Sequence, residues 1–233
     1  MKREAIILAG GFGTRLKSVV SDVPKPMAQV NDIPFLSYLL EQLHNNEFTQ
    51  VIIAAGYKSE VIESYYGSFF KKFKLVYSVE KEPLGTGGAI FEASSMIESD
   101  YFFVLNGDTF FNIDFNNLEE KFTENKSGLM VALKAMVNFD RYGTVTTSGE
   151  RITSFNEKKF CEKGLINGGI YIIDKNWFNQ RVDSKVFSFE KDILEKRVVE
   201  EQITYYKSDG YFIDIGIPED YKRAAEELPL LLR

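Results

Sequence analysis

Apolar residues recur in two rhythms along the first half of the chain, as short unbroken runs and as longer stripes of helical spacing. The runs carry apolar side chains on both faces, and they predict buried strands at residues 4–8, 51–55, 75–79 and 101–105. The stripes predict helices at residues 34–43, 59–66 and 86–95, with Thr86 as the N-cap of the last. This alternation of strand and helix indicates a largely parallel sheet with helices on both faces.

The second half of the chain has a mixed pattern. Helical spacing predicts helices at residues 115–125 and 189–196 and one that opens with Pro218, a favoured first position. Alternating apolar residues predict strands at residues 129–135, 143–147, 152–157, 169–173, 203–206 and 211–215. No internal repeat or Pro/Ser-rich linker divides the sequence, so we expect a single domain over residues 1–233.

Composition and charge exclude several classes of protein to which the chain could belong. The 233 residues, 44% of them apolar and 27% charged, suffice for the core of an ordinary globular domain. A net charge of −6 argues against a nucleic-acid partner, which would need a basic face. Cys161 is the single cysteine, so no internal disulfide forms, and the first apolar run is too short for a signal peptide. No run approaches the roughly 20 residues of a membrane span. We therefore expect a cytoplasmic protein without a membrane role.

A glycine-rich loop with the sequence LAGGFGTRL, from Leu8 to Leu16, follows the first predicted strand. Its glycines allow backbone N–H groups to approach a phosphate, although a tight turn alone would also explain them. A P-loop would end in Gly-Lys-Ser/Thr, whereas Arg15 and Leu16 stand here after Gly13 and Thr14. A dinucleotide fingerprint would need a small residue at Leu16 and an acid after the second strand, so a dehydrogenase is disfavoured.

This loop and the run PKPM at residues 24–27 together resemble the signature of the sugar-phosphate nucleotidyltransferases. The resemblance continues through EKEPLGTGGA (80–89), NGD (106–108), NEK (156–158), NGG (167–169) and FIDIG (212–216). It covers nearly the whole chain and implies a catalytic domain with a Rossmann-like, three-layer α/β fold of the GT-A type, built on a mixed, mostly parallel sheet. A nucleoside triphosphate and a sugar 1-phosphate would be its substrates.

Nucleotidyl transfer requires that the charge of an α-phosphate be neutralised, so cations and a metal ion should dominate the site. The resemblance gives Arg15 to the triphosphate and Lys25 to the reacting phosphates, although both could be solvated surface charges. Asp108 and Asp214 each end a predicted strand and could converge on Mg²⁺, which prefers carboxylates together with water and phosphate oxygens. Alternatively, Asp108 could be an ordinary turn residue and Asp214 an acidic residue that flanks a helix. Catalysis is therefore assigned to Arg15, Lys25 and Asp108, and Mg²⁺ to Asp108 and Asp214.

The resemblance also implies a set of nucleotide contacts: Leu8, Ala9, Gly10, Gly11, Gly13, Thr14, Arg15, Glu80, Gly85 and Thr86. Glu80 stands where pyrimidine-specific relatives commonly carry glutamine. A carboxylate only accepts hydrogen bonds, which suits the N1–H and exocyclic N–H₂ of guanine, whereas the carbonyls of uracil or thymine would repel it. We therefore expect GTP. Glu82 is a competing candidate for this contact, and the backbone of residues 85–88 could also supply base contacts.

The expected sugar-phosphate contacts are Gly143, Glu157, Lys158 and Asn167. Glu157 could accept hydrogen bonds from vicinal sugar hydroxyls, and Lys158 could reach the 1-phosphate. We expect Glu157 and Lys158 to follow one strand and Asn167 to open the next. The alternative for Glu157 and Lys158 is a charged pair flanking a hairpin.

Within the family, the short chain is most similar to guanylyltransferases that act on heptose or mannose 1-phosphate. Among their substrates, this similarity favours D-glycero-α-D-manno-heptose 1-phosphate as the expected acceptor. Mannose 1-phosphate with GTP and glucose 1-phosphate with dTTP or UTP are the alternatives. A non-catalytic regulatory copy of the same fold is disfavoured, since it has no chemical reason to keep Arg15, Lys25, Asp108 and Asp214. A homodimer is expected only from the general frequency of twofold assemblies.

Overall fold

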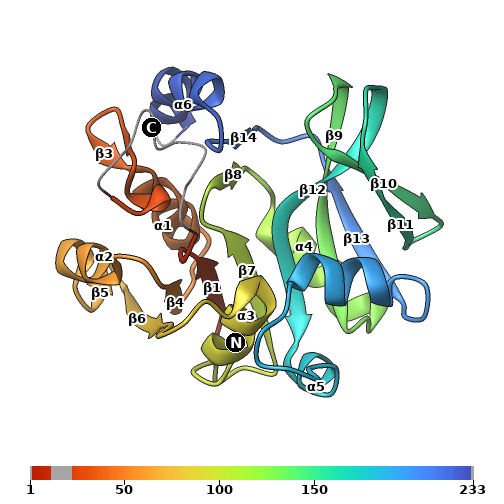
Figure 1. Cartoon of the computed structure of the whole chain (residues 1–233), viewed down its shortest axis with the longest axis horizontal. Helices are drawn as coiled ribbons and strands as arrows, with labels where there is room; N and C mark the ends of the chain where they lie inside the picture. Colours follow the sequence, from red (N-terminus) through yellow and green to blue (C-terminus); the bar gives the residue numbers. More distant parts are fainter. Residues whose placement is uncertain (1, 12–22, 232–233) are drawn as a thin grey trace.

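A ten-stranded mixed sheet runs through the described part of the chain, which in this computed structural model comprises residues 2–11 and 23–231 (Figure 1). Its strand order is β10-β11-β13-β9-β12-β7-β1-β4-β6-β5. The strands span β1 (Glu4–Leu8), β4 (Gln50–Ala55), β5 (Phe69–Phe70), β6 (Phe73–Val79), β7 (Tyr101–Asn106), β9 (Leu129–Phe139), β10 (Gly143–Ser148), β11 (Arg151–Lys158), β12 (Cys161–Asp174) and β13 (Ile203–Ser208). Two short antiparallel ladders pair β2 (Gln29–Val30) with β3 (Ile33–Pro34) and β8 (Thr109–Phe111) with β14 (Phe212–Asp214).

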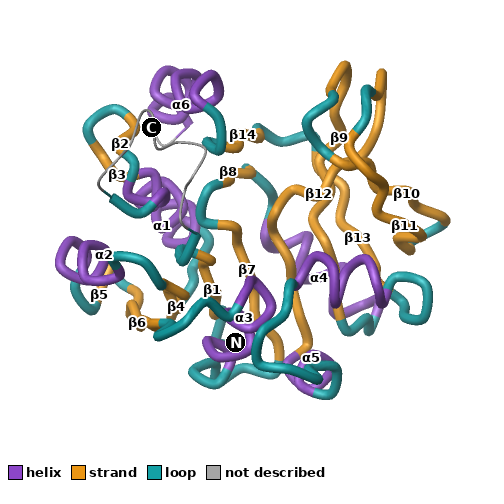
Figure 2. The backbone as a smooth tube through the Cα atoms, in the orientation of Figure 1, coloured by secondary structure: helices purple, strands orange, loops and turns teal. Residues whose placement is uncertain are grey.

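The parallel part of the sheet comes from the first half of the sequence. β1 pairs in parallel with β4 and β7, and β4 pairs in parallel with β6. The second half is mixed, because β12 is antiparallel to both β7 and β9 while β13 is parallel to β9. The strands β9, β10, β11 and β12 lie at the opposite end of the sheet from β4, β5 and β6 (Figure 2). The predicted α/β fold with a mixed sheet is thus confirmed.

Helices cover both faces of the sheet, as the apolar patterns predict. The helices are α1 (Phe35–Asn45), α2 (Ser59–Tyr66), α3 (Gly85–Ser94), α4 (Phe115–Asn125), α5 (Lys175–Asn179), α6 (Pro218–Leu231), the 3₁₀-helix η2 (Lys25–Met27) and the π-helix η3 (Phe189–Glu195). Along β1, Ala5 and Ile7 enter a core shared with α1, α2, α4 and α6, whereas Ile6 enters a core shared with α3, α5 and η3. Alternate side chains of a strand point to opposite faces, so β1 has a helical layer on each side. None of the helices formed by residues 2–11 and 23–231 is long and apolar enough to cross a membrane.

Two local predictions are corrected by the structure. Leu84, not Thr86, precedes α3, and Thr86 lies inside the first turn of this helix. β12 begins at Cys161, eight residues before the predicted start at residue 169. Its first half contains charges and glycines that read as loop, but antiparallel pairing from Cys161–Phe139 to Ile173–Leu129 holds it in the sheet. Pairing with a distant strand thus overrides the local pattern.

Candidate active site

Two adjoining cavities open at the carboxyl ends of the central parallel strands. The first has a volume of about 480 Å³ and is walled by residues that end or follow β1, β6 and β7, together with α3. The second, of about 440 Å³, lies over β10, β11 and β12. Asn106, Asp108 and Glu190 line both cavities. β1 lies between β4 and β7, where the strand order reverses, and α/β sheets commonly bind ligands at such a switch point.

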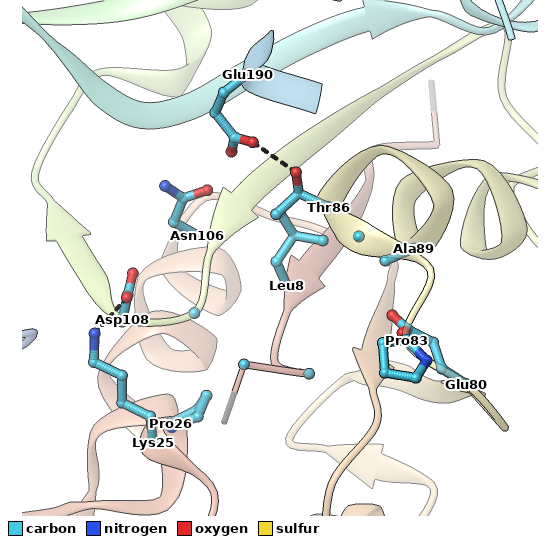
Figure 3. Close-up of a pocket in the computed structure, with 14 residues that line it drawn as sticks. Leu8, Lys25, Pro26, Glu80, Pro83, Thr86, Ala89, Asn106, Asp108 and Glu190 are labelled. Atoms are coloured by element: carbon cyan, nitrogen blue, oxygen red, sulfur yellow. Dashed lines mark hydrogen bonds and ion pairs between the residues drawn. The ribbon is translucent and has the colours of Figure 1, made fainter. Parts of the chain in front are cut away.

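The first cavity gathers most of the described residues of the predicted nucleotide set: Leu8, Gly10, Gly11, Glu80, Gly85 and Thr86. Figure 3 shows Lys25 and Asp108 at one end of this cavity and Glu80 at the other, with Leu8 between them. Ala9 does not line the cavity, because its side chain is buried in the core and its N–H donates to the carbonyl of Ala54. Gly13, Thr14 and Arg15 lie outside the described residues.

Glu80 lies directly after β6, with its carboxylate at the cavity wall. Oε2 accepts a hydrogen bond from the N–H of Leu84 at 3.1 Å. Oε1 faces Gly10, where a Cβ atom would stand 3.5 Å from it. Burial raises the pKa of Glu80, and the hydrogen bond from Leu84 partly opposes this shift. Glu82, the competing candidate, is exposed and lines neither cavity.

The glycines of α3 allow another segment to pack closely against the helix. Gly85 has φ of +73°, and a Cβ atom there would lie 2.5 Å from the carbonyl oxygen of Phe187. A Cβ atom on Gly88 would lie 2.2 Å from the carbonyl oxygen of Lys185. The Thr86 hydroxyl donates to Glu190 Oε2 at 2.6 Å and accepts from the N–H of Phe189 at 2.9 Å. These contacts join the first turn of α3 to the start of η3.

Lys25, Asp108 and Asp214 come together where the two cavities adjoin: Lys25 lines the first, Asp214 lines the second, and Asp108 lines both. Lys25 Nζ donates to Asp108 Oδ2 at 2.5 Å. Asp214 Oδ1 accepts from the N–H of Gly216 at 2.7 Å, and a Cβ atom on Gly216 would lie within 3.1 Å of both Asp214 Oδ1 and Lys25 Nζ. Burial raises the pKa of Asp214, the charge of Asp108 raises it further, and Lys25 opposes the shift. Two carboxylates thus lie beside one ammonium group, and the side chain of Asp108 is 37% exposed.

Asp214 reaches this position by a different route from the one expected. It ends β14, a strand of the small β8–β14 ladder and not of the parallel sheet. In that ladder Asp214 pairs with Thr109, and the N–H of Ile215 donates to the carbonyl of Asp108 at 2.9 Å. The antiparallel register therefore places the two carboxylates side by side.

The carboxylates where the two cavities adjoin suit a hard divalent cation. Within the described part of the chain, no group of three or more His, Cys, Asp or Glu residues is placed to hold a metal ion. Asp108 and Asp214 offer two carboxylates beside the cavity, and Mg²⁺ commonly binds one or two carboxylates and takes its other ligands from water and substrate phosphates. The residues present therefore fit Mg²⁺.

The second cavity brings together all of the predicted sugar-phosphate residues: Gly143, Glu157, Lys158 and Asn167. Two of the expected positions within strands were wrong. Glu157 and Lys158 are the last residues of β11 and do not follow it, and Asn167 lies inside β12 instead of opening it. Asn167 Oδ1 accepts from the N–H of Gly169 at 3.0 Å, and its Nδ2 donates to the Tyr171 hydroxyl at 2.8 Å. Asn167 therefore stabilises an irregularity in the β12–β9 pairing next to the cavity.

The sequence did not single out several residues of the cavity walls, including Asn106, Tyr142, Asn156, Tyr171 and Glu190. Asn106 stands in the NGD run beside Asp108 and could have been found from that motif. Glu190 lies within a predicted helix, and no local signal marks its approach to Thr86. That approach depends on the packing of η3 against α3.

Comparisons with known proteins identify a family and similar folds. Residues 4–229 match the protein family described as Nucleotidyl transferase. The chain is 47% identical over 225 residues to D-glycero-alpha-D-manno-heptose 1-phosphate guanylyltransferase of Aneurinibacillus thermoaerophilus, covering 97% of this chain and 98% of that protein. It is 48% identical to the Campylobacter jejuni protein of the same name, covering 94% of this chain and 96% of that one. The crystal structure of HddC from Yersinia pseudotuberculosis complexed with GMP-PN superposes with a TM-score of 0.87 at 37% identity, covering 97% and 99% of the two chains.

Proposed function

The chain belongs to the nucleotidyl transferase family, and on this basis we propose that it transfers GMP from GTP to D-glycero-α-D-manno-heptose 1-phosphate. An oxygen of the sugar phosphate attacks the α-phosphorus of GTP and forms a new P–O bond. The bond between that phosphorus and the bridging oxygen to the β-phosphate breaks, and pyrophosphate leaves. The observation that carries this proposal is the meeting of two cavities at Asp108, with Lys25 in contact with that carboxylate.

Lys25 is one cation that the described residues offer to the reacting phosphates. Its side chain is only 15% exposed, so its charge acts in a less hydrated environment than that of a surface lysine. Its ammonium group forms an ion pair with Asp108. This prepositioned ammonium group would stabilise the negative charge that develops on the phosphates during transfer. Arg15, with Gly13 and Thr14, is proposed from the sequence to hold the triphosphate.

Asp108 and Asp214 would hold Mg²⁺, which when bound neutralises phosphate charge and so assists attack at the α-phosphorus. Among this chain's own residues, Asp108 also keeps Lys25 at the junction of the cavities. Gly216 supports the same arrangement, since its N–H holds Asp214 and any larger residue would crowd both Asp214 and Lys25.

Glu80 is proposed to select guanine. Leu84 already donates to Oε2, and Oε1 faces the cavity next to Gly10. Each carboxylate oxygen has more than one lone pair, so the group can accept from both N1–H and the exocyclic N–H₂ of guanine while keeping its contact with Leu84. A pyrimidine would present a carbonyl to the same carboxylate and be repelled.

The second cavity is proposed to bind the sugar phosphate. Glu157 would accept from sugar hydroxyls and Lys158 would reach the phosphate, since both lie at the end of β11 where the cavity opens. Position 143 has no room for a side chain, because a Cβ atom there would lie 2.3 Å from the carbonyl oxygen of Asn156.

A substrate matrix tests the proposal. Purified protein is incubated with Mg²⁺, one of GTP, dTTP or UTP, and the 1-phosphate of heptose, mannose or glucose, and pyrophosphate release is measured. We expect the highest kcat/KM for GTP with the heptose 1-phosphate. A preference for mannose 1-phosphate would correct the sugar, a preference for a pyrimidine nucleotide would correct the role of Glu80, and no release with any pair would favour a non-catalytic copy of the fold.

A further inference from the structure

We propose that Glu190 is a specificity-determining residue that accepts a hydrogen bond from the C2 hydroxyl of the sugar 1-phosphate, the hydroxyl next to the phosphorylated carbon. This inference rests on the proposed function, because it concerns the sugar cavity of the same site. It assigns a role to a residue that none of the sequence motifs includes.

The position of Glu190 carries the first step. It lines both cavities, and Leu194 and Glu195, which belong to the same helix, line only the second. The helix η3 therefore belongs to the wall of the second cavity, and Glu190 is the residue of η3 that also lines the first. In Figure 3 the Glu190 carboxylate lies above Thr86, on the far side of the cavity from Lys25.

The hydrogen bonds of Glu190 leave one oxygen for a ligand. Thr86 donates to Oε2 at 2.6 Å, and the Ser188 hydroxyl donates to the same oxygen at 3.0 Å. Among the residues that the structure describes, no donor is assigned to Oε1. Phe189, next to Glu190, packs edge-on against Tyr171 with ring centroids 5.0 Å apart. One oxygen is thus fixed by a rigid framework while the other stays able to accept.

Chemistry then selects the ligand group. The junction of the cavities must hold the two phosphates that become linked, and an unprotonated carboxylate accepts from hydroxyl groups but repels phosphate oxygens. In a sugar 1-phosphate, the carbon that bears the phosphate is bonded to the ring oxygen and to C2. The hydroxyl on C2 is therefore the donor nearest to the phosphate along the covalent structure. The ribose hydroxyls are farther from the α-phosphate, because C5′ and C4′ intervene.

The test is a cycle of two changes, one in the protein and one in the substrate. Values of kcat/KM are measured for wild type and Glu190→Ala, each with GTP and either the sugar 1-phosphate that wild type uses best or its 2-deoxy analogue. We expect each single change to lower kcat/KM by about tenfold or more, the scale of a hydrogen bond to a charged group. The two changes together should lower it no further than either alone, because they remove the same contact.

A second set of measurements separates the other possibilities. Equal fold losses for Glu190→Ala on both sugar phosphates would overturn the proposal. The kcat/KM of wild type and Glu190→Ala is also compared with 2′-deoxy- or 3′-deoxy-GTP in place of GTP. If Glu190→Ala causes no loss with either analogue, the carboxylate contacts the ribose, and this result would overturn the proposal as well. Failure of wild type to release pyrophosphate with any sugar 1-phosphate would instead contradict the proposed function.

Two variants guard against a purely structural role of Glu190. Thr86→Val removes the tie to Glu190 Oε2 but leaves the carboxylate, so its effect should be the same fold change on the sugar phosphate and on the 2-deoxy analogue. Glu190→Gln keeps an oxygen for Thr86 and Ser188 but presents an amide nitrogen, which cannot accept, to the cavity. It should stay folded by circular dichroism and show the same loss of discrimination at C2. Glu226→Gln, on the exposed face of α6, is the matched control and should behave as wild type.

Discussion

At the scale of single residues, the candidate site holds charged groups close together. Lys25 and Asp108 are 2.5 Å apart, and Asp214 lies beside them with its pKa raised by burial and by the neighbouring carboxylate. Glu80 occupies the opposite end of the cavity as a half-buried acceptor. Each of these groups can be removed singly, and the resulting changes in kinetics distinguish their roles.

Lys25→Ala should lower kcat by about 10²-fold or more, since this is the scale of losing one electrostatic contact to a transition state. The physical reason is that the ammonium group is aimed at phosphates whose charge is redistributed during transfer. Steady-state kinetics with both substrates measure the effect, and Lys222→Ala on the exposed face of α6 is the control. A rise in KM at unchanged kcat would mean that Lys25 binds the ground state and the transition state alike.

Glu80→Gln should weaken the use of GTP by about 1–3 kcal/mol, because an amide offers one acceptor where two guanine donors need acceptors. The same change should relatively favour dTTP or UTP, since an amide can donate to a pyrimidine carbonyl and accept from N3–H. Measurement of kcat/KM for the three nucleotides checks this crossover. Glu82→Gln is the control. A crossover in that variant instead would transfer the role to Glu82, and a uniform loss in Glu80→Gln would place Glu80 away from the base.

At the scale of elements, the first turn of α3 and the segment before η3 act as one unit. Glycine at positions 85 and 88 lets the carbonyls of Phe187 and Lys185 approach the helix, and Thr86 bonds to Phe189 and Glu190. One wall of the first cavity therefore depends on a segment about one hundred residues away in the sequence. These glycines are therefore needed for packing, in addition to the base contacts that the sequence leads us to expect from their backbone.

Gly88→Ala should lower the thermal stability of the protein. Helix propensity alone predicts that alanine in a helix is about 1 kcal/mol more stable than glycine. The new methyl group would instead lie 2.2 Å from the backbone oxygen of Lys185, and such overpacking typically costs about 1–3 kcal/mol. Calorimetry decides the sign, with Glu92→Ala, an exposed site on the same helix, as control. A higher melting temperature for Gly88→Ala would refute the close approach.

At the scale of the whole molecule, part of the stability depends on a mostly buried carboxylate. Glu201 accepts from Arg181 through both guanidinium contacts, at 2.5 and 2.7 Å, and from the indole N–H of Trp177 at 2.9 Å. The hydrogen bond from Arg181 is the main reason that the pKa of Glu201 is lowered. This cluster fastens α5 to the segment that leads into β13.

The stability of the protein should therefore fall with acidification in a way that depends on Glu201. A carboxylate whose pKa is lower in the folded state stabilises the fold above its unfolded pKa of about 4.3, and this contribution is lost as the pH falls through the folded pKa. Glu201→Gln should cost about 1–3 kcal/mol at pH 7 and flatten the pH dependence below pH 4.5. Urea unfolding at a series of pH values measures both effects, and parallel curves for wild type and variant would contradict the assignment.

Much of the fold follows from local sequence patterns. Apolar runs on both faces predicted β1, one-sided stripes predicted α2 and α4 with the bounds that the structure has, and Pro218 marked the start of α6. These elements were predictable because the residues that define them are neighbours in the sequence. The motifs likewise pointed to Asp108 and Glu80, which stand next to strands, and to Lys25, which opens the 3₁₀-helix η2.

Only the tertiary structure decided how distant segments meet. β12 forms through pairing with β9 across a stretch of charges and glycines, Asp214 reaches Asp108 through the β8–β14 register, and Glu190 reaches Thr86 through the packing of η3 on α3. The partners in each case are separated by tens of residues, so no local periodicity records their contact. The sequence by itself determined the layers and the class of chemistry, and it named the residues that meet where the two cavities adjoin. The residues that would select among sugars are positioned by pairing between strands far apart in the sequence. The free energy of this pairing comes from contacts that exist only in the folded chain.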